Sequence, residues 1–491
     1  MYGHINGEED RREKELMEGS GSVTGSTFYG DDSENKLLSD LEDGYSHLRG
    51  GGSCKIRKET DSIRKNSLSP SASPAIVPEG KFSSPSLAPS RLQRLLSLDV
   101  FRGFTVALMI FVDYIGGIFP SISHSPWDGV NIADFVMPFF LFIVGVSLAL
   151  ALKRFPNKVD ASKKVLLRAL KLFILGLILQ GGFFHGVDDL TFGVDISSMR
   201  VMGILQRIAI AYLLVALCEI WFQPRSDPIE SGMALLGKYK LQLLAGSVWI
   251  ILYITFLYGI YVPDWTYEDP QAGINPRTLS VNCDIRGDTG PGCNAVGFID
   301  RKILGSEHLY KRPSYFRLKE CSVDSPNIGS LPYDSSPWCQ ASFDPEGLLS
   351  SMMAVITCLI GLQFGHVIIH FKNHKERIIN WMMASVFLLV VGFSLEMFGI
   401  HMNKDLYSLS YTCVTAGIAG TVFIGFYILV DVHGIRYLTI VMEWMGKHAL
   451  IIFVLVACNV LPSLIQGFYW KKQQNNLLTF MGIGKMKEKQ I

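Results

Sequence analysis

Apolar runs of about twenty residues dominate the chain from residue 98 onwards, and they constrain its fold more than any other feature. A helix of that length crosses the roughly 30 Å hydrocarbon core of a bilayer. The runs are separated by polar connections and occupy residues 98–120, 132–152, 166–184, 201–222, 241–261, 347–369, 379–400, 406–430 and 438–461. This pattern predicts an all-α fold, a polytopic membrane helix bundle of about nine transmembrane helices, because helices satisfy their backbone hydrogen bonds within lipid.

The first ninety residues have a different composition. They are rich in Gly, Ser and charged residues and include GSGSVTGST and SLSPSASPAIVPEG. Such a segment buries too little apolar surface to offset its ordering entropy, which predicts a disordered tail over residues 1–90. It also lacks the apolar core of a signal peptide, so we expect the first apolar helix to direct membrane insertion. Residues 91–470 then form the membrane domain, followed by a short tail over 471–491.

The distribution of Lys and Arg predicts the orientation of the bundle. Basic residues cluster before the first run and in alternate loops, for example at Lys153, Arg154, Lys372 and Lys375, whereas the loop SISHSPWDG has none. Because basic loops stay on the cytosolic side, the N-terminus is predicted to be cytosolic. The long loop over residues 262–346 is therefore predicted to be lumenal.

Four of the nine cysteines lie in this long loop, at Cys283, Cys293, Cys321 and Cys339. An even number of cysteines in an oxidising compartment predicts two disulfides. Three pairings are open to four cysteines; proximity in sequence favours Cys283 with Cys293 and Cys321 with Cys339. A metal site is the weaker interpretation, because the loop has no CxxC pair. The formal net charge of +1 gives no support for nucleic-acid binding.

Several ionisable or polar side chains fall inside the apolar runs. Asp99 and Arg102 are three residues apart on one helix face and can pair, and Gln206 and Arg207 lie within VMGILQRIAIAY. Charged groups are costly in hydrocarbon and usually face a protein interior or a wet cavity. As a set these residues indicate a polar path through the membrane, although each one alone also fits structural pairing or snorkelling.

His124 lies in FPSISHSPWDGVNIAD, between the first two runs at their non-cytosolic end. The surrounding Pro and Gly residues predict a rigid turn. A histidine there titrates near neutral pH and can act as a base or a nucleophile. Taken alone, a single loop histidine is more often structural than functional.

These residues belong to blocks that carry a family resemblance. RLLSLDVFRGFTVALMIFVDYIGG, SHSPWDGVNIADFVMPFFLFIVG, MGILQRIAIAY, VGFIDRKILGSEHLY, FDPEGLLSSM and LYSLSYTCVTAG occur in this order. Between about Arg91 and about Trp470 the chain resembles the heparan-alpha-glucosaminide N-acetyltransferase family, within the wider transmembrane acyltransferase group. The resemblance implies transfer of an acetyl group from cytosolic acetyl-CoA, a co-substrate, to a lumenal amine of the glucosamine type. It also implies an endomembrane location, in a lysosome or vacuole.

The resemblance implies that His124 is the active-site histidine. It either carries the acetyl group or deprotonates the acceptor amine, and we favour deprotonation because one base suffices for attack on a thioester. Asp128 is expected to orient His124. Asp99, Arg102, Gln206 and Arg207 are candidates for contact with acetyl-CoA, and no metal is predicted. The expected partners are the lipid bilayer and a small amine or amino-sugar acceptor, with homo-oligomer formation left open.

Two alternatives remain at this stage. A secondary transporter would also place polar residues within broken helices, but it should show internal repeats, and none is evident. The resemblance also implies a further apolar span after GFYWKKQQNNLLTF, where this sequence continues as MGIGKMKEKQI. This difference predicts a shortened isoform, which could be catalytically silent.

Overall fold

The computed structural model describes residues 95–116, 119–152, 157–181, 184–185, 191–192, 195–222, 232–268, 278–327 and 329–458. The chain divides into two units, Met1–Ser83 and Ser84–Ile491, and the described residues all belong to the second. The tail expected over residues 1–90 and the short tail expected over 471–491 lie outside the described residues.

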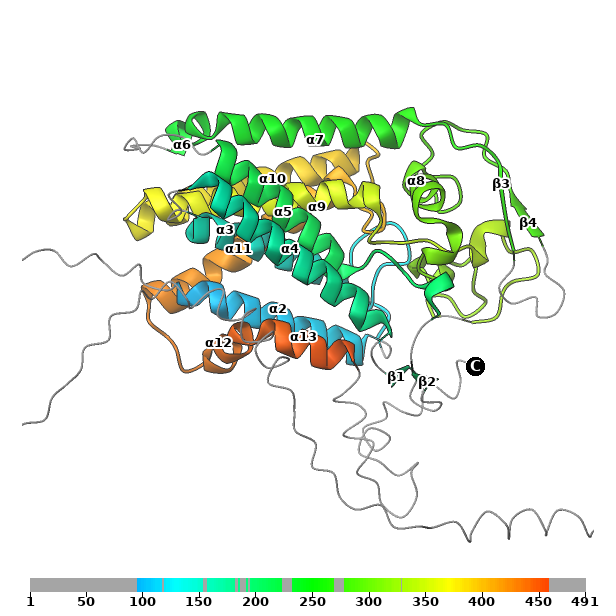
Figure 1. The fold of residues 1–491 in the computed structure, drawn as a ribbon, viewed down its shortest axis with the longest axis horizontal. Coiled ribbons are helices and arrows are strands. Elements are labelled where there is room, and N and C mark those ends of the chain that lie inside the picture. The colour runs from blue at the N-terminus through cyan, green and yellow to red at the C-terminus, as the bar shows by residue number, and fades with distance from the viewer. Residues whose placement is uncertain are drawn as a thin grey trace, which may run out of the picture. The chain divides into compact units, whose positions relative to one another are not determined.

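The second unit is mostly helical (Figure 1). Its helices, labelled as in Figure 1, are α2 (Leu96–Ile115), α3 (Val136–Leu152), α4 (Lys158–Gly181), α5 (Ile204–Phe222), α6 (Gly232–Lys238), α7 (Lys240–Gly259), α8 (Ala295–Leu304), α9 (Leu348–His370), α10 (His374–Met397), α11 (Leu409–Phe426), α12 (Ile440–Lys447) and α13 (Ala449–Ala457). Short 3₁₀ segments are η1 (Ile132–Phe135), η2 (Ile196–Ser198), η3 (Ser306–His308), η4 (Ser314–Arg317) and η5 (Pro337–Gln340), and a π-helical segment, η6 (Tyr427–Val432), continues α11. The strands form two antiparallel pairs, β1 (Phe184–His185) with β2 (Thr191–Phe192) and β3 (Trp265–Glu268) with β4 (Thr278–Val281).

Six described helices are long and apolar enough to cross a membrane. They correspond to η1 with α3, α5, α7, α9, α10, and α11 with η6. The pair α12–α13, bent by 76°, raises the number to seven if it counts as one span. The predicted count of about nine transmembrane helices is therefore not confirmed. Helices α2 and α4 do lie where the first and third spans were expected, but charged residues interrupt their apolar character, including Asp99, Arg102 and Asp113 in α2.

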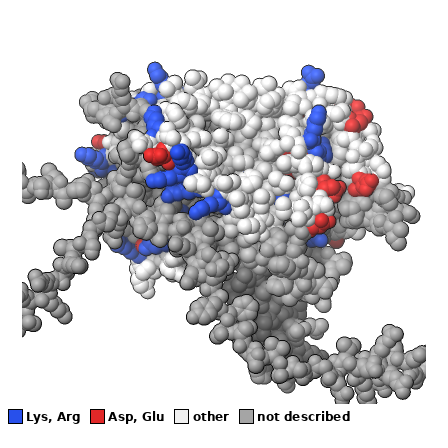
Figure 2. Space-filling model, viewed as in Figure 1, with Lys and Arg blue, Asp and Glu red and all other residues white. Residues whose placement is uncertain are grey.

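Large apolar side chains on the outer helices are exposed, which is the pattern expected of a surface in contact with lipid tails. In α10 they include Met383, Phe387 and Val390, and α7 contributes Leu244 and Ile251. On the face drawn in Figure 2, an almost uncharged band lies between the two ends of the helices. Most Lys and Arg side chains on this face gather at the end where α6 lies, and its Asp and Glu side chains lie mainly at the opposite end. The protein is thus built as an integral membrane protein.

Close contact between α3 and α9 forms the centre of the bundle. A Cβ atom on Gly145 would lie 2.0 Å from the carbonyl oxygen of Cys358, and one on Gly361 would lie 2.2 Å from that of Phe142. Only glycine allows the two backbones to approach this closely, as is common between membrane helices. Apolar residues from the neighbouring helices pack around this contact in two buried clusters.

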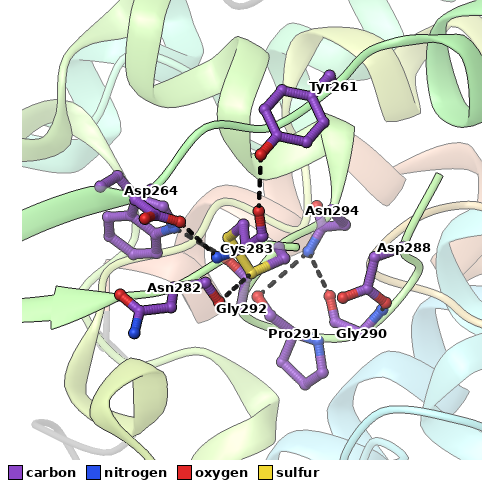
Figure 3. Close-up of a disulfide and its surroundings, with 11 residues drawn as sticks. Tyr261, Asp264, Asn282, Cys283, Asp288, Gly290, Pro291, Gly292 and Asn294 are labelled. Atoms are coloured by element: carbon purple, nitrogen blue, oxygen red, sulfur yellow. Dashed lines mark hydrogen bonds between the residues drawn. A yellow bond between two sulfur atoms is a disulfide. The ribbon is translucent and has the colours of Figure 1, made fainter. Parts of the chain in front are cut away.

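The connection between α7 and α9 folds into a compact layer beyond one end of the helices, containing β3, β4 and α8 (Figure 1). Two disulfides cross-link residues within this layer, Cys283–Cys293 and Cys321–Cys339, with Cα–Cα distances of 5.6 and 5.4 Å. This is the pairing that proximity favoured. Figure 3 shows how the first disulfide is fixed: the backbone N–H of Cys283 donates to Asp264 Oδ1 at 2.7 Å, and the hydroxyl of Tyr261 donates to the Cys283 carbonyl at 3.1 Å.

Candidate active site

The turn between α2 and α3 is held against two distant parts of the chain. Gly129 has a φ of 90°, a conformation that favours glycine, and its N–H donates to the Met402 carbonyl at 2.7 Å. The indole N–H of Trp127 donates to the Thr289 carbonyl at 3.1 Å, and its ring packs edge-on against Tyr315. The turn is therefore fixed by tertiary contacts as well as by the Pro and Gly residues that predicted it.

Within this turn the His124 ring meets a buried carboxylate. His124 Nδ1 lies 2.7 Å from Asp134 Oδ1, and the Asp134 side chain is fully buried. The second carboxylate oxygen, Oδ2, accepts the backbone N–H groups of Ser125 at 3.1 Å and Asn131 at 2.8 Å. Asp134 is held in turn because the Tyr411 hydroxyl donates to its carbonyl at 2.5 Å. A carboxylate fixed in this way can orient an imidazole ring.

Two cations also contact His124. Lys404 Nζ lies 3.0 Å from His124 Nδ1. The guanidinium of Arg317 donates to the His124 carbonyl and, at 2.5 Å, to Ser123 Oγ. Both contacts of the ring within the described part of the chain are made at Nδ1, which leaves Nε2 for a ligand.

A cavity of about 420 Å³ opens beside His124. It is lined by Gly116, Pro120, Ser123, His124, Arg200, Tyr310, Arg312, Pro313, Ser314, Arg317, Pro326, Asn327, Pro345, Glu346, Lys404 and Asp405. The lining comes from the α2–α3 turn, the segment before α5, the cysteine-bearing connection and the segment before α11. With 42% of its side-chain surface exposed, His124 is accessible to a ligand in this space.

Arg200 and Glu346, which also line the cavity, belong to a compact ion-pair network. Arg200 pairs with Asp344, with Nε–Oδ2 and NH2–Oδ1 distances of 2.9 and 2.5 Å, and also with Glu346. Burial opposes the charged form of Glu346, but Arg200, Arg207 and Lys404 outweigh it and lower the pKa of Glu346 to about 2. Glu346 thus carries a negative charge at any physiological pH. Asp405 differs, because burial raises its pKa to about 6 despite the neighbouring Lys404.

The electrostatics around His124 favour its neutral form. Partial burial and the nearby Lys404 ammonium lower the pKa of His124 below its usual 6.5, and the contact with Asp134 opposes this shift without cancelling it. A neutral imidazole with one free ring nitrogen is the form that can accept a proton. The site therefore has the chemistry of a general base beside a mixed-charge cavity.

Asp128, the residue expected to orient His124, lies elsewhere in the same turn. Asn403 donates to its carboxylate at 3.4 Å, and the two residues form an isolated antiparallel bridge. Its carbonyl accepts from Ser125 Oγ at 2.6 Å. Asp128 thus holds the turn against the segment before α11, and the carboxylate beside the His124 ring is that of Asp134.

Asp99 and Arg102 lie at the far end of α2 and do not join the His124 cavity. At a rise of 1.5 Å per residue, Asp99 is about 24 Å along the helix from Ile115, where the turn begins. The expected pairing of Asp99 with Arg102 is present at 3.3 Å, and Arg102 also donates to Ser147 Oγ at 3.1 Å. These two residues mark a second polar position, next to α12, whose Gly446 carbonyl accepts from Arg102 at 3.5 Å.

Gln206 and Arg207 lie in the first turn of α5. Arg207 is buried, donates to the Pro345 carbonyl at 2.6 Å and to Ser350 Oγ, and so fixes the start of α9. Gln206 packs against α4, with its amide close to Gly176. Arg207 supports the wall of the cavity through Pro345, and neither residue lines it.

The residues that complete the site were not among the predicted site residues; they are Asp134, Lys404, Arg317, Arg200 and Glu346. One signal was available for Asp134: Asn131 and Asp134 form a reciprocal capping box around η1, a pattern of short polar residues three apart before an apolar run. The others come from separate loops, and no local pattern distinguishes them from ordinary surface charges.

Comparison with known proteins agrees with the resemblance. Residues 94–266 match the family model described as "Heparan-alpha-glucosaminide N-acetyltransferase, catalytic". The chain is 28% identical to the heparan-alpha-glucosaminide N-acetyltransferase of Mus musculus over 403 residues, which cover 77% of this chain and 55% of the mouse protein. It is also 28% identical to the Homo sapiens protein of that name over 404 residues, covering 78% of this chain and 55% of the human one. The chain thus spans about half the length of the curated relatives it matches.

Proposed function

We propose that this chain, which is similar to heparan-alpha-glucosaminide N-acetyltransferases, is a member of that family and transfers an acetyl group from cytosolic acetyl-CoA to an amine on the lumenal side of the membrane. The observation that carries this proposal is the His124–Asp134 pair, with a ring-to-carboxylate distance of 2.7 Å, at the wall of the cavity. Acetyl transfer to an amine needs a base at the wall of the cavity in which the acceptor binds. The acceptor is proposed to be a small amine or amino sugar of the glucosamine type.

In the proposed reaction His124 acts as the base. The acceptor nitrogen attacks the thioester carbonyl carbon, the C–N bond forms, and the C–S bond breaks with its electron pair leaving on sulfur. The proton lost by the nitrogen passes to His124 Nε2 and then to the thiolate, which leaves as the free thiol. Asp134 keeps Nδ1 protonated during these steps, because its carboxylate accepts a hydrogen bond and its other oxygen is already held by the turn.

The orientation of the protein is part of the proposal. Lys and Arg gather at the α6 end of the face drawn in Figure 2, which favours the cytosol for that end. The disulfides lie in the layer at the opposite end, which favours an oxidising lumen. In this orientation the cavity at His124 opens to the lumen, and Asp99 and Arg102 lie near the cytosolic surface, where we propose that they contact acetyl-CoA. A lysosomal or vacuolar membrane is the proposed location.

Acetyl transfer can be tested directly. Vesicles containing the purified chain, supplied with labelled acetyl-CoA outside and glucosamine inside, should accumulate labelled N-acetylglucosamine. Protein-free vesicles provide the control for uncatalysed transfer, and vesicles with His124→Gln protein test separately whether His124 is the base. Intact, well-folded protein that gives no label above the protein-free control would contradict the proposed function.

Secondary transport is a second candidate, favoured by one observation. Helices α12 and α13 form a broken pair bent by 76°, and transporters often bind their substrates at such breaks. Free acetyl-CoA or free amino sugar crossing the membrane unchanged would identify a transporter. Product that appears only as the acetylated amine would identify an enzyme.

A further inference from the structure

Two side chains of opposite hydrogen-bonding character meet the same ring nitrogen of His124. Asp134 Oδ1 lies 2.7 Å from Nδ1 and Lys404 Nζ lies 3.0 Å from it. A carboxylate only accepts hydrogen bonds and an ammonium only donates them. Nδ1 cannot satisfy both partners at once, because it either carries a hydrogen or offers a lone pair.

The two partners therefore select opposite tautomers of the ring. A hydrogen on Nδ1 suits Asp134 and leaves a lone pair on Nε2, which is what a base at the cavity needs. A lone pair on Nδ1 suits Lys404 and places the hydrogen on Nε2. In that tautomer Nε2 has no free lone pair, so it cannot take a proton from an amine. The balance between the two contacts decides whether His124 is competent as a base.

The structure shows which of the two partners can move. Asp134 is fixed, because its other oxygen holds two backbone N–H groups of the turn. Lys404 has a flexible stem, is half-buried and lines the cavity, so a ligand can reach it. The acidic groups on its side of the cavity are already engaged: Glu346 pairs with Arg200, and Asp405 accepts from Ser314 Oγ.

We propose that Lys404 is a positioning residue that controls the tautomer of His124. While the Lys404 ammonium donates to Nδ1, the ring keeps its hydrogen on Nε2. When a bound substrate draws the ammonium away, the ring can adopt the Nδ1–H tautomer, which donates to Asp134. This inference rests on the proposed role of His124 as the base. The charged groups facing the site are Asp134 from η1, Arg317 from η4, Glu346 from the segment before α9, and Lys404 with Asp405 from the segment before α11.

The group that draws Lys404 away must accept a hydrogen bond from an ammonium. The thioester carbonyl oxygen of the donor and an oxygen of the acceptor both have this chemistry. In the first case Lys404 would also stabilise the negative charge that develops on the carbonyl oxygen during attack. Adding the two substrates separately distinguishes the two sources.

The test is the ¹⁵N spectrum of the imidazole nitrogens in the full chain, reconstituted in nanodiscs with labelled histidine. The chain has 11 histidines, so the His124 signals are assigned by their loss in His124→Gln. We expect the unliganded protein to show the Nε2–H form, and Lys404→Met to show the Nδ1–H form. Lys319→Met, which removes an exposed lysine outside the cavity, should match the unaltered protein. Acetyl-CoA and glucosamine are then added separately. The substrate whose oxygen draws Lys404 away should convert the unaltered protein to the Nδ1–H form when it is added alone.

An unliganded protein that already shows the Nδ1–H form would overturn the proposal; this measurement is made on the unaltered protein, and His124→Gln serves only to assign its signals. The same tautomer in Lys404→Met and in the unaltered protein would also overturn it. A second readout is the pH dependence of transfer: Lys404→Met should move the acid limb of kcat/KM to higher pH by about 1 unit, because a positive charge beside the ring has been removed. Lys404→Arg, which keeps the charge, should leave the limb in place. A tautomer change without any acetyl transfer would leave this inference standing and remove the proposed function.

Discussion

Asp134 Oδ1 lies 2.7 Å from His124 Nδ1, whereas Asp128, which is closer in sequence, bonds to Asn403. The turn between α2 and α3 folds back on itself so that Asp134 in η1 lies beside the His124 ring. A carboxylate ten residues away thereby becomes the partner of the base.

This relationship predicts different outcomes for two conservative substitutions. Asp134→Asn replaces the acceptor of the Nδ1 proton by an amide and should lower kcat on the order of 10²–10⁴-fold, because the tautomer with a free Nε2 loses its support. Asp128→Asn keeps a hydrogen-bonding side chain beside Asn403 and should change kcat less than about threefold. Steady-state acetyl transfer to glucosamine measures both. An equal loss in the two variants would show that the turn as a whole matters and that Asp134 has no special role.

Removing the base itself should separate chemistry from donor binding. His124→Ala is expected to lower acetyl transfer on the order of 10²–10⁴-fold, the typical contribution of general acid–base catalysis. The thermal shift produced by acetyl-CoA should persist, because the donor is proposed to bind chiefly near Asp99 and Arg102. Loss of the thermal shift together with activity would indicate a structural histidine, and near-normal turnover would remove His124 from the mechanism.

The pH dependence of transfer follows from the lowered pKa of His124. A base must be unprotonated, so kcat/KM should rise with pH through the pKa of His124 in the free enzyme and then level off. Because partial burial and Lys404 lower this pKa below 6.5, the acid limb should lie below pH 6.5 and activity should persist in a mildly acidic lumen. A limb centred above pH 7 would contradict the assigned surroundings of the ring.

The ion pairs of Arg200 should be important for stability. Arg200→Gln leaves the buried carboxylates of Asp344 and Glu346 without their guanidinium, and breaking such a pair typically costs about 3–5 kcal/mol. Arg312→Gln is the matched control: this exposed arginine also lines the cavity, and its loss should change stability by less than about 0.5 kcal/mol. Thermal unfolding in detergent compares the two variants.

The same network should tolerate acid. The pKa of Glu346 is lowered from 4.5 to about 2, so its contribution to stability is fully present above pH 4.5 and is lost only as pH falls towards 2. Burial raises the pKa of Asp344, the other carboxyl paired with Arg200, so the test is made in an Asp344→Asn background. A marked loss of the Arg200-dependent stability between pH 7 and pH 5 in that background would contradict the assignment of Glu346.

The two disulfides predict a simple labelling pattern. Cys283, Cys293, Cys321 and Cys339 should not react with a membrane-impermeant maleimide until a reductant is added. A cross-link that closes a loop of about 15 residues typically stabilises by about 3 kcal/mol, so reduction should also lower the unfolding temperature. Mass spectrometry of the labelled peptides identifies each site, and complete labelling before reduction would rule the disulfides out.

Much of this protein could be predicted because the relevant information is local in sequence. Apolar runs long enough to span lipid predicted a helical membrane protein, since a single segment carries that signal. Two cysteine pairs separated by 10 and 18 residues favoured the observed disulfides for the same reason. The Pro and Gly residues around His124 likewise predicted a turn, which the structure contains.

Other properties were decided only by the tertiary structure. The sequence predicted about nine spans, whereas six described helices, or seven with the bent pair, are long and apolar enough to cross a membrane, because charged residues interrupt α2 and α4. The partners of His124 depend on chain segments far apart: Lys404 is 280 residues away and Arg317 is 193 residues away. Local periodicity cannot encode such contacts. They arise because packing of α3 against α9 and the folded connection before α9 bring these loops to one end of the bundle, where opposite charges share a cavity and set the protonation of the ring.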